Sequence, residues 1–461
     1  MDVNGFQSDN RCNDIMPIHS LEGVLRGFGF GIHHVDGHDQ DAVLAAWESA
    51  RGRLDVILAD TVKGGGSQLL PSAVSPETGL LAQPWHTKVP PWPLYCDVVT
   101  EQLGVAGDAA ATHAWQQHLS STLTPEACAT LPNTLRPAAG ALQGTGKAFG
   151  AYLCGLLGAR EDVVIVDADL ATSCGLNAAV GHPRYYEVGV SEQDMVSFGA
   201  GMALAGQRPV VNTYANFFRR AYENIAIALA EGARVVYAGA YAGLCYHTDG
   251  KSHQSTNDAS AMVALPGLIV MDPVTPAQTC ALAEWALRPD TVSSVYFRLR
   301  RTPCPALCVV DEAAQGLYSP SVPVVVRQPD ALTEPFVVFV TMGTIGTDLA
   351  LRCVKEVPGF RGANIIVVPA LNMPTVDEAL WAGLFRSAHS VITIEDDAGA
   401  LRAFVLERLA HPALPSRPQL VSKTLRGFGP SFRTLPACLE HHGYTVEAIL
   451  ALYLESLLPQ P

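Results

Sequence analysis

The sequence lacks a long apolar segment and an excess of basic residues. None of its hydrophobic runs approaches the roughly 20 residues that a helix needs to cross a bilayer, so no membrane-spanning helix is expected. Its 461 residues carry 30 Lys and Arg against 44 Asp and Glu, which gives a net charge of −14. Nucleic acids and anionic membrane surfaces attract clustered basic residues, so this balance argues against both as partners.

Paired cysteines are also missing. Of eleven cysteines only Cys304 and Cys308 lie close together, and a structural zinc site would need a second such pair. We therefore expect reduced thiols in a cytoplasmic protein. The first residues, MDVNGFQSDNRCND, are polar and acidic, and predict neither a secretory nor a transit signal.

Short buried strands that alternate with helices run through most of the chain. RLDVILADTV, EDVVIVDADL and PFVVFVTMG are typical of parallel strands buried on both faces, and KAFGAYLCGLLGA has helical spacing. This alternation predicts an α/β fold of three doubly wound domains in series. Proline-rich stretches separate them and predict a first domain at 1–95, a connector at 96–140, a second domain at 141–303, a linker at 304–334 and a third domain at 335–461.

One segment, GVSEQDMVSFGAGMALAGQRPVV, identifies a family resemblance. It places Glu192 between a strand end and a helix rich in small residues. The segment resembles the transketolase family of thiamine-diphosphate enzymes, where such a glutamate contacts the aminopyrimidine nitrogen of the cofactor and activates it. The resemblance implies that the three domains are the end of a diphosphate-binding domain, a pyrimidine-binding domain and the transketolase C-terminal domain.

Further matches imply the residues of a cofactor site. Asp169 in VDADL and the aromatic pair Tyr214 and Phe217 in NTYANFF match family positions that face the cofactor. In NTYANFFRR, Arg220 stands where many members carry a third aromatic residue. Asn4 and the backbone carbonyl of Phe6 match the end of the family's metal motif and imply ligands to Mg²⁺ or Ca²⁺.

The resemblance also implies residues that face the substrate. YHTDGKSHQS resembles a family signature in which His253 assists proton movement and Asp249 contacts the hydroxyl groups of the donor. Ser173 in ATSCG and His86 in WHTKVP match other substrate-facing positions. Arg301 in SVYFRLRR matches an arginine that binds substrate phosphate.

Departures from the family pattern shape the functional expectation. The G-D-G part of the metal motif is absent before Asn4, which implies that a separate chain supplies the missing half, roughly a domain in size. A gene fragment or a misassigned start codon is the competing explanation. The resemblance implies a heterotetramer that self-associates through the pyrimidine-binding domain.

Two substrate positions differ as well. Tyr241 and Gly146 stand where transketolases carry a histidine and an arginine that contact phosphate, so an unusual substrate is expected. The resemblance implies transfer of a two-carbon ketol unit from a ketose donor to an aldehyde acceptor. A decarboxylating subunit, similar to 1-deoxyxylulose-phosphate synthase or pyruvate dehydrogenase, and a catalytically inactive scaffold subunit remain as alternatives.

Overall fold

The computed structural model describes residues 1–7, 10–18, 20–70, 90, 92–122, 143–302, 320–327 and 336–458. The chain divides into two compact units. One contains Met1–Arg136 with Val188–Val190, and the other contains Pro137–Glu187 with Ser191–Pro461. Within the described ranges no helix combines the length and the apolar character that crossing a membrane requires.

The first unit is built on a small parallel sheet with strand order β1-β3-β2. The strand that RLDVILADTV predicted is present as β3, and it follows a strand and a helix. Asp39 caps the helix α3, because its side chain accepts hydrogen bonds from the amides of Asp41 and Ala42. The strands and helices of this part are β1 (Asp2–Val3), α1 (Cys12–Ile15), α2 (Leu21–Gly27), β2 (Gly31–Asp36), α3 (Gln40–Ala50) and β3 (Asp55–Asp60).

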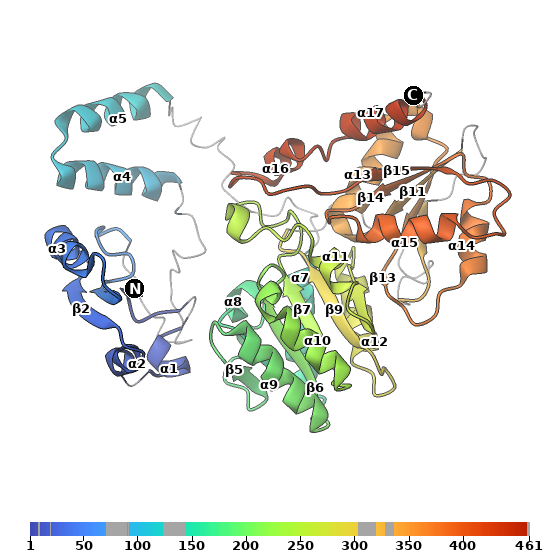
Figure 1. Cartoon of the computed structure of the whole chain (residues 1–461). Coiled ribbons are helices and arrows are strands. Elements are labelled where there is room, and N and C mark those ends of the chain that lie inside the picture. Colours follow the sequence, from blue (N-terminus) through green and yellow to red (C-terminus); the bar gives the residue numbers. More distant parts are fainter. Residues whose placement is uncertain are drawn as a thin grey trace. The chain divides into compact units, whose positions relative to one another are not determined.

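The segment after residue 91 is more regular than the sequence suggested. It forms two helices, α4 (Trp92–Ala106) and α5 (Ala109–Thr122), which pack on each other (Figure 1). The prolines and the weak helical periodicity predicted a connector between domains. Pro93 lies in the first turn of α4, where a helix tolerates proline because its first amides need no partner within the helix.

A seven-stranded sheet organises the first half of the second unit, with strand order β13-β8-β9-β7-β6-β4-β5. All neighbours are parallel except β13, which pairs antiparallel with β8. Every residue of β4, β6, β7, β8 and β9 is buried, as the continuous apolar runs predicted. The strands are β4 (Val163–Asp167), β5 (Tyr185–Glu187), β6 (Arg208–Tyr214), β7 (Val236–Ala240), β8 (Leu268–Met271), β9 (Ser294–Leu299) and β13 (Ala370–Leu371).

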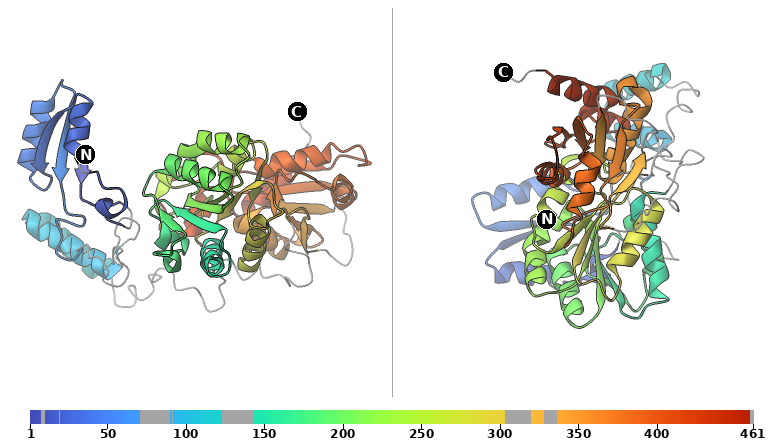
Figure 2. Two further views of the ribbon diagram at one scale, coloured as in Figure 1. Left: turned by 90° about the horizontal axis from the view of Figure 1, so that it is seen from below. Right: turned by 90° about the vertical axis from the view of Figure 1, so that its right-hand side faces the viewer.

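Helices cover both faces of this sheet. Helices α9 and α10 pack on one face and α7 and α12 on the other, so that the sheet lies between the two pairs (Figure 2, right). Phe149 on α7 contacts Phe297 on β9 with ring centroids 4.9 Å apart, inside the core on the α7 side. The helices are α7 (Thr145–Leu157), α8 (Ala171–Cys174), α9 (Glu192–Leu204), α10 (Tyr222–Ala230), α11 (Asp258–Met262) and α12 (Pro276–Ala286).

A five-stranded sheet with order β10-β12-β11-β14-β15 forms the second half of this unit. The predicted strand PFVVFVTMG is present as β11, and the alternation of strands and helices confirms the expected α/β fold. The elements are β10 (Val324–Arg327), β11 (Val337–Thr341), α13 (Gly343–Glu356), β12 (Asn364–Val367), α14 (Glu378–Phe385), β14 (Ser390–Ile394), α15 (Ala400–Leu409), β15 (Gln419–Lys423), α16 (Leu435–His441) and α17 (Val446–Ser456).

A buried ion network joins the two halves. Arg298 at the end of β9 donates to Asp258 and Asp272, and Arg300 donates to Asp272 and to Asp396 after β14. All five side chains are at most 1% exposed. Removing one partner from such a cluster would leave a buried charge uncompensated, so the network fixes how β9 meets the C-terminal sheet.

Candidate active site

Glu192 is the first residue of α9 and is only 4% exposed. A carboxylate is stabilised at this end of a helix, where the backbone amides and the helix dipole carry partial positive charge. Its two oxygens both accept from Nη1 of Arg220, at 3.1 and 3.2 Å. Glu192 is therefore a buried carboxylate that is paired with a positive charge and held in one orientation by Arg220.

An aromatic wall adjoins the residues that hold Glu192. Tyr214 ends β6 and lies 5.4 Å from Phe217 between ring centroids, and Tyr214 stacks on Tyr241 at 4.6 Å. The guanidinium carbon of Arg220 lies 5.0 Å from the centroid of Phe217. Arg220 follows Phe217 by three residues in a short helical turn, so one side chain contacts both the ring and the carboxylate.

Two of the residues predicted to face the substrate lie on a loop beside this wall. His253 contacts Phe217 and Tyr246 with ring centroids 5.3 Å apart in each case, and its Nδ1 lies 2.8 Å from the hydroxyl of Ser252. Asp249 accepts hydrogen bonds from the hydroxyl groups of Tyr246, at 2.7 Å, and Thr248. The aromatic rings hold His253 while the hydroxyl groups orient Asp249.

Ser173 belongs to the same cluster. Its hydroxyl accepts from the hydroxyl of Tyr214 at 2.9 Å, and its carbonyl accepts from that of Tyr241 at 3.0 Å. Tyr241 has a positive φ of 60°, an unusual conformation for a bulky residue. The hydrogen bond and the ring contacts hold Tyr241 in this strained conformation beside the site, as is common for functional loops.

Arg301 lies against two aromatic rings of the cluster. Its guanidinium carbon lies 5.5 Å from the ring centroid of Tyr241 and 5.3 Å from that of Tyr246. The preceding arginines of the motif have a different role, because Arg298 and Arg300 belong to the buried ion network. Of the three arginines in SVYFRLRR, Arg301 alone is partly exposed and lies near the aromatic wall.

The acids after β4 have unequal surroundings. Asp169 is buried at a positive φ of 60°, and its amide donates to Glu187. Asp167 is fully buried and accepts from Asn212, from the amide of Leu170 and from the hydroxyl of Tyr185. Burial raises the pKa of Asp167 to about 6, because water no longer stabilises its charge. Sequence reasoning selected Asp169 and missed Asp167, whose polar partners come from two other strands.

The predicted metal ligands lie in the first unit. The side-chain oxygen of Asn4 accepts from the amide of Phe6 at 2.9 Å, and its nitrogen donates to Asp2 at 2.8 Å. These bonds form a compact turn that brings the Asn4 side chain beside the backbone of Phe6. Nowhere in the described part of the chain do three His, Cys, Asp or Glu residues gather as a metal site would need. His86 lies outside the described residues.

Comparison with known proteins identifies the central domain of the chain. The family model of the transketolase pyrimidine-binding domain matches residues 141–305, the part that carries Glu192 and His253. This part of the chain is a transketolase pyrimidine-binding domain. A split-gene transketolase, solved as an inactive beta4 tetramer, is 25% identical to it, with a TM-score of 0.56 over 68% of this chain and 98% of that one.

Other relatives of the chain are longer. The 1-deoxy-D-xylulose-5-phosphate synthase of Myxococcus xanthus is 28% identical over 90% of this chain and 64% of its own length. That of Treponema pallidum is 33% identical over 34% of this chain and 25% of its own. The transketolase of Campylobacter jejuni, at 18% identity and a TM-score of 0.55, shares the fold over 93% of this chain and 68% of that one. The chain thus spans less than two thirds of the length of these synthases.

The family implies thiamine diphosphate, and the residues at the pyrimidine end fit it. A buried carboxylate is present at Glu192, and the partly exposed ring of Phe217 offers an apolar face next to it. Arg220 occupies one direction of the carboxylate, but an ionised carboxylate has about four acceptor positions and can accept a further hydrogen bond. The fit concerns the pyrimidine end alone, since the metal and diphosphate end depends on the first unit.

Proposed function

We propose that this chain is one subunit of a split transketolase-like enzyme. The enzyme transfers a two-carbon ketol unit from a ketose donor to an aldehyde acceptor with the help of thiamine diphosphate. The observation that carries the proposal is the buried, Arg220-paired carboxylate of Glu192 beside the Tyr214–Phe217 wall. Thiamine diphosphate supplies the electron sink that lets a carbon–carbon bond next to a carbonyl group break and form.

In the proposed enzyme, Glu192 accepts a hydrogen bond from the aminopyrimidine nitrogen of the cofactor. A buried carboxylate makes a stronger hydrogen bond than an exposed one, because water does not compete for its oxygens. Phe217 packs against the pyrimidine and excludes water from it, while Arg220 holds the carboxylate in one orientation. Tyr214 supports Phe217 from the core side, and Asp169 with its bond to Glu187 shapes the adjoining strand end.

We assign the substrate contacts to the loop that carries Asp249 and His253 and to the residues beside it. His253 moves a proton to or from the hydroxyl or carbonyl oxygen of the substrate, since its imidazole is held beside Phe217. Asp249 and Ser173 position substrate hydroxyl groups, and Arg301 binds a phosphate or another anionic group of the substrate. Tyr241 fills the place of a cationic residue in transketolases, so we propose a substrate with less phosphate recognition at that point.

A separate chain is proposed to supply the diphosphate-binding half. In this arrangement Asn4 and the carbonyl of Phe6 contribute two oxygen ligands to Mg²⁺ or Ca²⁺, and the partner contributes the aspartate and the remaining ligands. Two copies of each chain form a heterotetramer in the cytoplasm. The exposed apolar side chains of Leu44 and Trp47 on α3, at 59% and 67%, are consistent with a surface that a partner covers.

A second candidate is supported by the curated relatives. Several of them are 1-deoxy-D-xylulose-5-phosphate synthases, so a decarboxylating reaction with a 2-oxo acid donor is the alternative to ketol transfer. A pyruvate-dehydrogenase-like subunit belongs to the same alternative. An inactive scaffold subunit is the third possibility.

Donor specificity separates these functions. The complex with its partner is supplied with thiamine diphosphate, Mg²⁺, an aldehyde acceptor, and either a ketose phosphate or pyruvate. Ketol transfer predicts a new ketose from the ketose donor without release of CO₂. Release of CO₂ from pyruvate, with no turnover of the ketose, would instead establish the decarboxylating candidate. A complex that assembles with its partner but binds no thiamine diphosphate supports the scaffold.

A further inference from the structure

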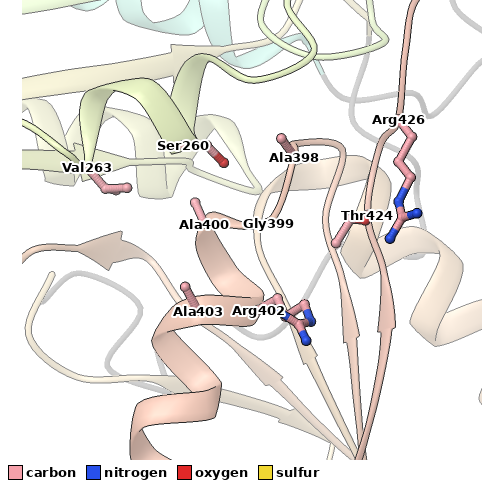
Figure 3. A pocket seen from close by; sticks show the side chains of 9 residues that line it. All are labelled: Ser260, Val263, Ala398, Gly399, Ala400, Arg402, Ala403, Thr424 and Arg426. Atoms are coloured by element: carbon pink, nitrogen blue, oxygen red, sulfur yellow. The ribbon is translucent and has the colours of Figure 1, made fainter.

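Two adjoining cavities in the second unit are lined by basic groups that the proposed reaction does not use. The first, of about 540 Å³, lies between α11 and α15, and its lining includes Ser260, Arg402, Thr424 and Arg426 (Figure 3). The second, of about 480 Å³, shares Thr424 and Arg426 with the first. Both volumes fall within the range of about 300–1,000 Å³ that small-molecule sites occupy.

The side chains that line the two cavities include basic residues and no acidic ones. Every ionisable side chain that lines either cavity is basic or an imidazole, namely Arg402, Lys423, Arg426, His441 and His442. The chain as a whole carries a net charge of −14, so this local concentration runs against the general composition. Such a lining attracts anions and repels cations.

The two guanidinium groups have no carboxylate partner among the described residues. Figure 3 shows Arg426 extending toward Thr424 from the segment after β15, while Arg402 comes from the start of α15. Neither forms an ion pair in the part of the chain that the structure describes, although Arg408 on the same helix α15 pairs with Glu378 and Glu407. Guanidinium groups bind phosphate oxygens in a bidentate manner, so two of them lining one cavity suit a phosphate group.

The acids of the surrounding elements are engaged elsewhere. Glu395 accepts from the amides of Leu401 and Arg402, and Asp397 accepts from the amides of Ala259 and Ser260. Both carboxyl groups are buried behind the cavity wall. Their oxygens therefore complete the backbone hydrogen bonds of α15 and α11 and leave the guanidinium groups available to a ligand.

The second cavity adds groups that suit an organic part. Phe428 and the imidazoles of His441 and His442 line it, and Nε2 of His442 is buried with no hydrogen-bond partner. Burial and the neighbouring His441 and Lys423 lower the pKa of His442. The faces of the imidazole and phenyl rings accommodate the uncharged part of a ligand.

We propose that these cavities form a binding site for a small organic phosphate. Its phosphate group lies between Arg402 and Arg426 near Thr424, and its organic part extends toward Phe428 and His442. The site is distinct from the Glu192 site, and the proposal does not depend on the proposed reaction.

Calorimetry of the full chain with inorganic pyrophosphate tests this site. We compare the unmodified chain with the double variant Arg402→Gln, Arg426→Gln. The matched control is Arg386→Gln, Arg417→Gln, which removes the same charge from two exposed arginines outside both cavities. We expect at least about a tenfold weaker affinity for the first variant and an unchanged affinity for the control. No binding by the unmodified chain, or equal weakening in both variants, overturns the proposal.

Hydrogen exchange gives a second measurement that needs no variant. Pyrophosphate is expected to slow amide exchange in peptides that contain Ser260, Arg402 and Thr424, because a bound ligand reduces local opening. Slower exchange confined to other parts of the chain, such as the turn at Asn4 where a cofactor diphosphate is expected, would place the anion elsewhere and contradict the site.

Discussion

The carboxylate of Glu192 and the guanidinium of Arg220 form an ion pair whose two members differ in exposure. Glu192 is 4% exposed, whereas the Arg220 side chain is 57% exposed. The pair therefore connects a buried group to the solvent side of the site. Arg220 also lies over Phe217, so one side chain links the two residues assigned to the aminopyrimidine.

Replacing Arg220 with Met tests that link. The variant should bind thiamine diphosphate about tenfold more weakly in the complex, because the Glu192 carboxylate loses the group that fixes its direction. Titration calorimetry measures the change. The matched control is Arg219→Met, since Arg219 bonds Asn257 and not Glu192. Equal loss in both variants would mean that the positive charge, and not the ion pair, matters.

A double-mutant cycle separates this role from stability. Because Arg220 is exposed to solvent, we expect the coupling energy between Glu192 and Arg220 to be roughly 0.5–1 kcal/mol in the free energy of unfolding. Glu192→Gln, Arg220→Met and the double variant are unfolded with urea. A coupling energy of several kcal/mol would show that the pair is mainly a structural element.

The buried network predicts a much larger effect at Arg298. Arg298→Met leaves Asp258 without its buried partner, and we expect a loss of about 3–5 kcal/mol in the free energy of unfolding. The control is Arg352→Met, because Arg352 makes only an exposed pair with Glu356 and should cost less than about 0.5 kcal/mol. Similar losses in the two variants, measured by urea unfolding, would contradict the network's role in joining the sheets.

The pH dependence of stability should reveal Glu395. Burial raises its pKa to about 8 from an ordinary value of 4.5, so the folded state holds this proton more tightly than the unfolded state does. Its contribution is fully present below pH 4.5 and is lost as pH rises through 8. Glu395→Gln should therefore flatten the decline in stability across that window. An unchanged slope in thermal melting between pH 5 and 8 would contradict this assignment.

The substrate proposal makes a prediction at Tyr241. Tyr241→His introduces an imidazole where transketolases carry a phosphate-contacting histidine, and histidine tolerates the positive φ of this position better than most side chains. We expect the ratio of kcat/KM for phosphorylated acceptors to kcat/KM for unphosphorylated acceptors to rise about tenfold. Tyr241→Phe, which loses only the bond to the Ser173 carbonyl, is the control. A preference for phosphorylated acceptors that is unchanged in the His variant would exclude this position from substrate recognition.

The features that the sequence predicts depend on residues that lie close together along the chain. Strands such as β4 and β11 are continuous apolar runs, and Glu192 and His253 lie in motifs of a few residues. What the sequence could not indicate depends on distant partners. Arg298 finds its acids at positions 258, 272 and 396, and Asp167 finds Asn212 on another strand. The two residues of β13 carry no pattern, yet they pair with the edge of the seven-stranded sheet.

The contacts missed near the site follow the same rule. The sequence singled out Arg220 but not its pairing with Glu192, which lies 28 positions away. The signal that could have found it is the three-residue spacing from Phe217, which places both side chains on one side of a helical turn. Tyr246 was quoted only as part of a motif, although it contacts Tyr241, Asp249 and His253.

Cofactor binding by the assembled complex tests the central claim most directly. The chain is coproduced with the protein encoded immediately upstream, and binding of thiamine diphosphate with Mg²⁺ is measured by calorimetry for the complex and for this chain alone. Binding by the complex only, together with loss of activity but not of assembly in Glu192→Ala, is the predicted result. A complex that assembles but binds no cofactor would contradict a split enzyme and leave a scaffold subunit as the better account.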